Sequence, residues 1–142
     1  MGLNDAMDIS VSGIKANRLH MEIIASNVAN MTSTRSMDGG PYRRKIPVFS
    51  ESSANFSRVY QGALNKQVGG VAITDIISDP SPPSRVFNPS HPDADSQGYV
   101  SLPNVSYSQE MTDMMFSTRL YEANITVFNA TKKMAQDTLQ IQ

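Results

Sequence analysis

The distribution of proline divides this chain into three segments. All 8 prolines of the 142-residue sequence lie between residues 41 and 103, so neither end contains any. Proline removes a backbone hydrogen-bond donor and clashes with the preceding helical turn, which keeps it out of helix interiors. The two ends can therefore form long helices, whereas the middle cannot. This predicts an α+β fold with a discontinuous helical domain of residues 1–32 and 106–142, and a β-rich region of residues 33–105.

The N-terminal end has the periodicity of an amphipathic helix over residues 3–30. Apolar residues recur every three or four positions from Leu3 onward, with one interruption at Arg18, as they do on one face of a helix. Asn4 or Asp5 is expected to cap the start of this helix. A weaker second stripe comprises Ile9, Ala16, Leu19 and Ile23. The main stripe is a predicted helix-pairing surface made of Met7, Val11, Ile14, Arg18, Met21, Ala25 and Val28.

The C-terminal end, residues 106–141, carries two apolar stripes that lie about 200° apart around a helix. Ser106 and Gln109 have the spacing of a capping box at its start. The first stripe and the residues beside it are predicted to pair with the N-terminal helix. They are Met111, Met114, Tyr121, Glu122, Ile125, Phe128, Lys132 and Leu139. The second stripe is expected to contact neighbouring subunits through Phe116, Leu120, Val127, Met134 and Ile141. A helix that is apolar on two sides must be covered on both, and the alternative is that the middle of the chain folds back over it.

The two helices fit together as an antiparallel coiled coil, in which a positions of one helix face d positions of the other. One register pairs Ile14 with Ile125 and Val28 with Met111. Its polar pairs are Arg18 with Glu122 and Lys132 with Asp8, so each interruption of a stripe meets an acidic residue. Registers shifted by one heptad also place a positions opposite d positions, so they remain alternatives.

The middle of the chain contains short runs with the composition of β-strands, separated by proline-rich segments. We therefore expect a small β-hairpin region joined by extended loops, with a mobile segment near residues 51–68. The predicted strand runs are residues 42–49, 70–77 and 84–87, with a weaker run at 99–102.

Bulk properties exclude several function classes. The net charge is −1, so the chain lacks the basic surplus that nucleic-acid binding requires. The one basic run, Arg43-Arg44-Lys45, is read as a solvated strand edge or loop, or else as a contact site. The absence of cysteine excludes disulfides and thiolate metal sites. The N-terminus has no signal-peptide pattern and no apolar run is long enough to enter a membrane.

The segment from His91 to Asn104 invites a metal-binding interpretation. Asp93 and Asp95 have the spacing at the start of an EF-hand loop, but the final position is Asn104 where a bidentate Glu is needed. A loop held by turns and prolines is the expected alternative. No catalytic residue, metal or cofactor is predicted, although composition alone does not exclude a Ser–His–acid site.

Residues 24–30 (IASNVAN), which follow an amphipathic helix, resemble the motif shared by flagellar axial proteins of the rod, hook and hook-associated types. Three further blocks resemble the proximal-rod branch of this family: residues 40–45, residues 88–100, and residues 103–114. The positions that match family motifs are Ser26, Asn27, Asn30, Pro41, Tyr42, Arg43, Arg44, His91, Pro92, Asp93, Asp95, Gly98 and Tyr99.

The resemblance implies a structural subunit of the proximal rod of the bacterial flagellar basal body. Such subunits polymerise through their terminal helices into a helical tube that crosses the periplasm, transmits torque and surrounds the export channel. The implied partners are further copies of the chain, other rod subunits, the rod-base adaptor and the flagellar type III export apparatus, which exports the chain without a cleaved signal peptide. The alternatives are another rod or hook-junction axial subunit, and a small Ca²⁺- or ligand-binding module that uses residues 88–104.

Overall fold

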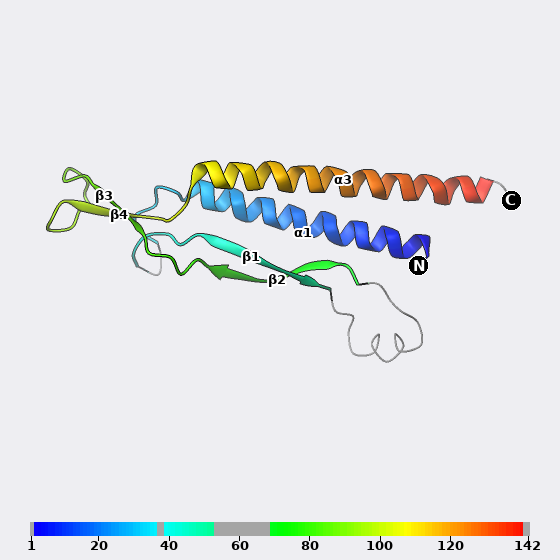
Figure 1. The fold of residues 1–142 in the computed structure, drawn as a ribbon, viewed down its shortest axis with the longest axis horizontal. Coiled ribbons are helices and arrows are strands. Elements are labelled where there is room, and N and C mark those ends of the chain that lie inside the picture. Colours follow the sequence, from blue (N-terminus) through cyan, green and yellow to red (C-terminus); the bar gives the residue numbers. More distant parts are fainter. Residues whose placement is uncertain (1, 37–38, 53–68, 141–142) are drawn as a thin grey trace, which may run out of the picture.

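The computed structural model describes residues 2–36, 39–52 and 69–140. Two long antiparallel helices lie side by side, and two β-hairpins lie along and beyond them (Figure 1). The elements in chain order are α1 (Leu3–Ala29), β1 (Lys45–Glu51), β2 (Val71–Ser78), β3 (Ser84–Phe87), β4 (Tyr99–Leu102) and α3 (Tyr107–Gln140). The α+β class, both terminal helices and the strands between them are confirmed. The mobile segment predicted near residues 51–68 falls almost entirely outside the described residues.

Helix α1 is the central layer of the molecule. Figure 1 shows α3 on one side of it and the β1–β2 hairpin on the other, with both chain ends at the same end of the helix pair. The β3–β4 hairpin extends from the opposite end. The described part of the β region therefore packs against α1 and leaves the far side of α3 uncovered.

The strands form two separate antiparallel hairpins. Strand β1 pairs with β2 from Lys45 opposite Ser78 onward, with an irregularity between Val48 and Phe49, and β3 pairs with β4. The first strand begins at Lys45, three residues later than the predicted run. The residues before it, Tyr42 and Arg44, use their side chains to bind the helices instead.

Both helix starts differ in detail from the prediction. Gly2 is the N-cap of α1, so neither Asn4 nor Asp5 occupies the cap itself. Asp5 lies at the third helical position, where its carboxylate accepts the Gly2 backbone N–H at 2.7 Å, as an acidic residue in a capping box does. Ser106 precedes α3 as predicted, and its carbonyl accepts the first helical N–H, that of Glu110.

The interior is thin and largely polar. Among the described residues the buried apolar side chains are Ala16, Ile23, Ile24, Val100 and Pro103. The buried polar ones are Ser10, Asn17, Asn27, Glu110, Ser117 and Thr131. Each of these polar groups lies on α1 or α3, so hydrogen bonding rather than apolar packing dominates the interior of the helix pair.

The contact between α1 and α3 is a ladder of polar and small residues that repeats every seven positions. Three rungs show it: Gly13 against Asn124, His20 against Ser117, and Asn27 against Glu110. A Cβ atom at Gly13 would lie 2.9 Å from Asn124 Nδ2, so the helices approach closely there. We call these three pairs the seam.

The predicted apolar stripes lie beside the seam instead of forming its centre. Thr118 Oγ1 is 3.6 Å from Met21 Sδ, and this pair lies seven residues along each helix from the expected Ile14–Ile125 layer. The two helices are therefore aligned lengthwise as predicted. Each helix is turned about its own axis by about one residue, or 100°, so that the seam faces the partner helix in place of the apolar stripe. Five members of the predicted pairing surface are exposed as a result: Arg18, Ala25, Glu122, Lys132 and Leu139.

The predicted polar pairs across the helices do not form. Arg18 Nε lies 3.0 Å from Glu22 Oε1 on the same helix, not beside Glu122. Lys132 has no carboxylate within ion-pair distance among the residues the structure describes. The rotation of the interface explains both differences, because it moves these positions from the helix contact to the surface.

Candidate assembly site

Asn27 joins three elements at the C-terminal end of α1. Its side chain is 1% exposed. Its amide nitrogen donates to the Lys45 carbonyl at 2.9 Å and to Glu110 Oε2 at 3.1 Å. Its amide oxygen accepts from Tyr42 Oη and from the Lys45 backbone N–H, both at 2.9 Å. All four hydrogen-bonding positions of the amide are thus used, and α1, β1 and α3 are fixed relative to one another.

Glu110 is the acidic centre of the same cluster. It is 0% exposed, and its Oε1 lies 2.5 Å from Arg44 Nε. Arg44 also places Nη2 3.3 Å from Asp113 Oδ2. A buried carboxylate needs such compensation because removing an unpaired charge from water is costly. The three residues of the basic run therefore differ in role. Arg44 is partly buried and forms ion pairs, while Arg43 and Lys45 are exposed.

His20 and Ser117 form a hydrogen bond of 2.9 Å between Nδ1 and Oγ in the middle of the seam. Burial lowers the pKa of His20, the carboxylates of Asp113 and Glu110 oppose that shift, and Arg44 adds to it. The His20 ring also meets Phe49 edge-on at 5.4 Å. Ser117 is 0% exposed and lines neither cavity described below. The Ser117 hydroxyl is therefore enclosed between the two helices and is not part of either cavity.

The family-motif residues His91, Asp93 and Asp95 lie in the β3–β4 hairpin, away from the Asn27 cluster. Asp93 accepts from Thr34 Oγ1 at 2.8 Å and pairs with Arg35 Nε at 2.7 Å. Its backbone N–H donates to His91 Nδ1 at 3.1 Å. These contacts attach the hairpin to the segment that follows α1.

Asp95 organises the turn of the hairpin. Its Oδ1 accepts the backbone N–H groups of Gln97 and Tyr99, and its Oδ2 pairs with Arg85 at 2.8 Å. These hydrogen bonds, chiefly the one from Tyr99, lower the pKa of the Asp95 carboxyl. Gly98 has φ +80°, and a Cβ there would lie 2.9 Å from the Phe87 ring, so the turn requires glycine.

The two aspartates of the EF-hand-like segment bind different basic residues and do not converge. In the part of the chain that the structure describes, no group of three or more His, Cys, Asp or Glu side chains is arranged to hold a metal ion. Neither described helix combines the length and apolar character needed to cross a membrane.

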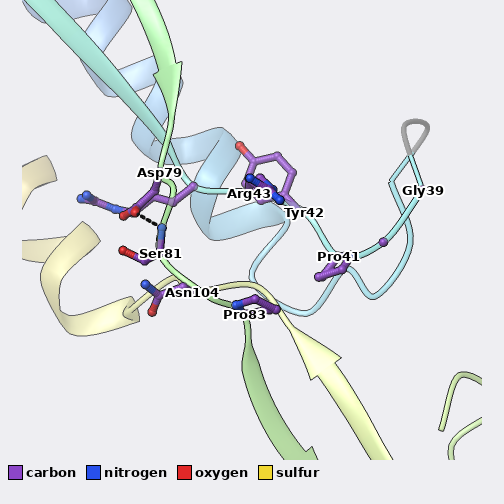
Figure 2. Close-up of a pocket in the computed structure, with 10 residues that line it drawn as sticks. Gly39, Pro41, Tyr42, Arg43, Asp79, Ser81, Pro83 and Asn104 are labelled. Carbon is purple, nitrogen blue, oxygen red and sulfur yellow. Dashed lines mark hydrogen bonds between the residues drawn. The ribbon is translucent and has the colours of Figure 1, made fainter. Parts of the chain in front are cut away.

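A cavity of about 170 Å³ lies beside the Asn27 cluster. Figure 2 shows Tyr42 and Arg43 on one side of it, and Asp79, Ser81 and Asn104 facing them. The Ser81 backbone N–H donates to Asp79 Oδ1 at 2.8 Å, and hydrogen bonding by the Ser81 side chain and backbone lowers the pKa of Asp79. Pro41, another family-motif position, also lines this cavity.

The second apolar stripe of α3 is exposed along its described length. Phe116 is 62% exposed, Val127 50% and Met134 57%. Leu120 is 39% exposed, and Ile141 lies outside the described residues. The described strands do not fold back over these side chains, as the alternative interpretation required, because β1 and β2 pack against α1 and none of the four strands packs against α3.

Sequence reasoning missed the seam and the role of the Asn27 cluster. The family motif included Ser26, Asn27 and Asn30, and the structure gives each a function at the helix end: Asn30 Nδ2 donates to the Ser26 carbonyl at 2.8 Å. The residues that were missed are Gly13, His20, Glu110, Ser117 and Asn124. The signal that would have found them is their heptad spacing as small and polar residues.

Two family models match this chain. One, described as flagella basal body rod protein, covers residues 7–35, and another, described as the C-terminal part of flagellar basal body rod FlgEFG proteins, covers residues 96–141. Asn27 and Glu110 of the buried cluster lie one in each matched segment.

Curated relatives match over nearly the whole chain. The flagellar basal-body rod protein FlgC of Borreliella burgdorferi is 38% identical over 99% of this chain and 98% of its own length. The FlgC protein of Bacillus subtilis is 38% identical over 96% of this chain and 95% of its own length. The FlgC protein of Escherichia coli O157:H7 is 38% identical over 99% of this chain and 98% of its own length.

Proposed function

Because the chain belongs to the FlgC family of flagellar basal-body rod proteins, we propose that it polymerises through its terminal helices into the proximal part of the rod. It is a structural subunit of the flagellar basal-body rod. Its role in the proposal is mechanical rather than catalytic: the helices form a helical tube around the export channel, and the β-hairpins brace that tube against torque.

The observation that carries the proposal is the exposed stripe of α3. Fully burying one large apolar side chain contributes about 1.5–3 kcal/mol. A stripe that includes Phe116, Val127 and Met134, each at least 50% exposed, therefore provides a driving force for association. Contiguous exposed apolar surface is typical of interaction sites.

The Asn27 cluster and the seam supply the rigidity that a torque-bearing subunit needs. Buried polar groups fix helix register because only one alignment satisfies their hydrogen bonds. The three seam pairs lie seven residues apart, so sliding by less than a heptad breaks all of them. The proposed subunit can thus transmit force without its helices slipping.

The finer assignments of partners and route belong to the same proposal. The chain is exported through the flagellar type III apparatus without a cleaved signal peptide, and it then assembles with further copies, other rod subunits and the rod-base adaptor. The thin apolar interior supports this route, because a chain with few buried large side chains is easily unfolded for passage.

The proposal is tested in a flagellated bacterium that lacks its own FlgC gene. The natural chain should restore motility and appear in isolated basal bodies. The double variant Phe116→Lys/Val127→Lys places two charges in the exposed stripe, so we expect it to be produced but to leave cells without rods.

Asn129→Lys is the matched control, because Asn129 is exposed on the same helix but lies off the stripe. It should restore motility. Rods of normal appearance in cells that carry the stripe variant would contradict assembly through this face.

A further inference from the structure

We propose that the exposed stripe of α3 docks antiparallel on the outer side of α1 of a second copy of this chain, with Arg119 opposite Glu22 and Lys133 opposite Asp8. This contact would be heterologous, since it joins two different surfaces. The proposal rests on the proposed function, because it names the surfaces through which that assembly forms.

The stripe has the spacing of a second coiled-coil seam. Its members alternate four and three positions apart and are all exposed: Phe116, Leu120, Ala123, Val127, Ala130 and Met134. That alternation places them on the a and d positions of a heptad. The two alanines allow a partner helix to approach closely. The expected occupant is therefore a helix and not a flat surface.

A line of exposed residues spaced seven apart borders this stripe: Arg119, Thr126 and Lys133. On α1, the exposed residues Asp8, Lys15 and Glu22 form a line with the same spacing. The two ends of each line are 14 positions apart, which is about 21 Å along a helix.

Antiparallel alignment makes these two lines complementary. Asp8 then meets Lys133, Glu22 meets Arg119, and Lys15 meets the neutral Thr126. Glu22 already pairs with Arg18 at 3.0 Å, but both side chains are more than half exposed, so this surface pair is weak and leaves the second oxygen of Glu22 free to accept.

The line of Asp8, Lys15 and Glu22 on α1 does not face α3 of the same chain. It lies about 140° around α1 from the seam, as the helical repeat requires for residues five positions apart. Beside it runs a groove of about 400 Å³ between α1 and β2, whose apolar lining includes Val11, Leu19 and Ile73. Asp8 and Lys15 also line this groove. The groove therefore offers apolar surface to the α3 stripe next to the charged residues Asp8 and Lys15.

Symmetric pairing of two α3 stripes is disfavoured by charge. An antiparallel α3–α3 contact would bring the basic lines toward each other, and like charges at the flanks of a coiled coil repel. A contact between two different surfaces instead repeats from copy to copy and generates a ring or a helical filament, which is the geometry a rod needs.

The natural chain has no cysteine, so an engineered pair reports the contact directly. The test variant is Lys15→Cys/Thr126→Cys, which places one thiol on each line at the proposed crossing. The control is Lys15→Cys/Thr112→Cys, since Thr112 lies on the same α3 line two heptads away and, like Thr126, bonds the carbonyl four residues earlier. Both variants are expressed in cells that depend on this chain for motility, and isolated basal bodies are oxidised and analysed on non-reducing gels.

The test variant should convert from monomer to disulfide-linked multimers, whereas the control should remain monomeric. Normal incorporation with no cross-link in the test variant, or equal cross-linking in both, would overturn the inference and leave the proposed function intact. Failure of the natural chain itself to restore motility would instead count against the proposed function.

Exchanging the charges of the two lines tests the proposed contact if the cysteine variants are not incorporated into basal bodies. Arg119→Glu/Lys133→Glu and Asp8→Lys/Glu22→Lys should each lose assembly alone, because each opposes like charges at both ends. Co-expressed, the two chains present complementary lines to one another and should recover assembly. Normal assembly by either chain alone, or no recovery together, would refute the proposed contact.

Discussion

At the scale of single residues, Asn27 connects parts of the chain that are far apart in sequence. One side chain binds Tyr42, both backbone groups of Lys45, and Glu110. A short amide suits this position because it donates and accepts at once. Aspartate would lose both donors and would add a second negative charge beside Glu110.

Asn27→Ala is expected to lower the free energy of unfolding by about 2–4 kcal/mol, since it leaves several buried polar groups without partners. Urea unfolding of the full chain, followed by circular dichroism, measures the change. This and the other urea measurements are made at a protein concentration at which neighbouring copies keep both helices formed. Asn129→Ala, at an exposed position of α3, should shift stability by no more than about 0.5 kcal/mol. Equal effects of the two substitutions would show that the Asn27 cluster does not hold the helix junction together.

His20 makes stability depend on pH. Burial lowers its pKa below the ordinary value of 6.5, so the unfolded chain binds a proton more readily than the folded chain. The free energy of unfolding therefore rises with pH below about 6.5, and this group contributes no further change above that value. In His20→Gln, the difference in urea midpoint between pH 5.0 and pH 7.5 should be smaller than in the natural chain. An unchanged difference would mean that other groups carry the pH dependence.

At the scale of elements, the sequence predicted helices and strands better than it predicted their contacts. Proline-free ends and alternating runs determine where α1, α3 and the strands form, because these are local properties. The centre of the helix pair was missed because apolar periodicity does not detect a seam made of small and polar residues. Seam residues such as Gly13 and Ser117 are recognised by their close approach and hydrogen bonding across the helix pair, which depend on the partner helix.

Gly13 illustrates how the partner helix determines a residue. Alanine is favoured over glycine inside a helix by about 1 kcal/mol, but a Cβ at this position would lie 2.9 Å from Asn124 Nδ2. Gly13→Ala alone should therefore stabilise the chain by less than that amount or destabilise it. Gly13→Ala/Asn124→Ala should recover the helical gain.

A double-mutant cycle of urea midpoints measures the coupling between the two positions. A positive coupling free energy of about 0.5 kcal/mol or more is the expected result. Additive effects would contradict the close contact between the helices at this rung.

At the scale of the whole molecule, the layers explain why the free subunit has spare surface. Helix α1 is covered by α3 on one side and by β1–β2 on another, whereas α3 is covered only by α1 among the described elements. Seven positions on the described strands also expose large apolar side chains: Phe49, Val71, Ile76, Ile77, Val86, Phe87 and Tyr99. The β-hairpins are thus further candidates for contacts with neighbours.

The thin interior predicts that the helix pair is weak in the isolated chain. With Ala16, Ile23 and Ile24 as the buried apolar residues of the described helices, little apolar burial opposes the conformational entropy lost when two helices of 27 and 34 residues are ordered. We expect low helicity by circular dichroism in dilute solution, increasing with protein concentration as neighbouring copies cover α3. Limited proteolysis of the dilute chain should remove residues near both ends before it cleaves the β-hairpins.

Phe116→Lys/Val127→Lys should abolish the concentration dependence of helicity while leaving the circular dichroism spectrum of the dilute chain unchanged. A fully helical monomer that unfolds cooperatively at every concentration would show that α1 and α3 stabilise each other without neighbours, and would remove the energetic reason for assembly through the outer face of α3.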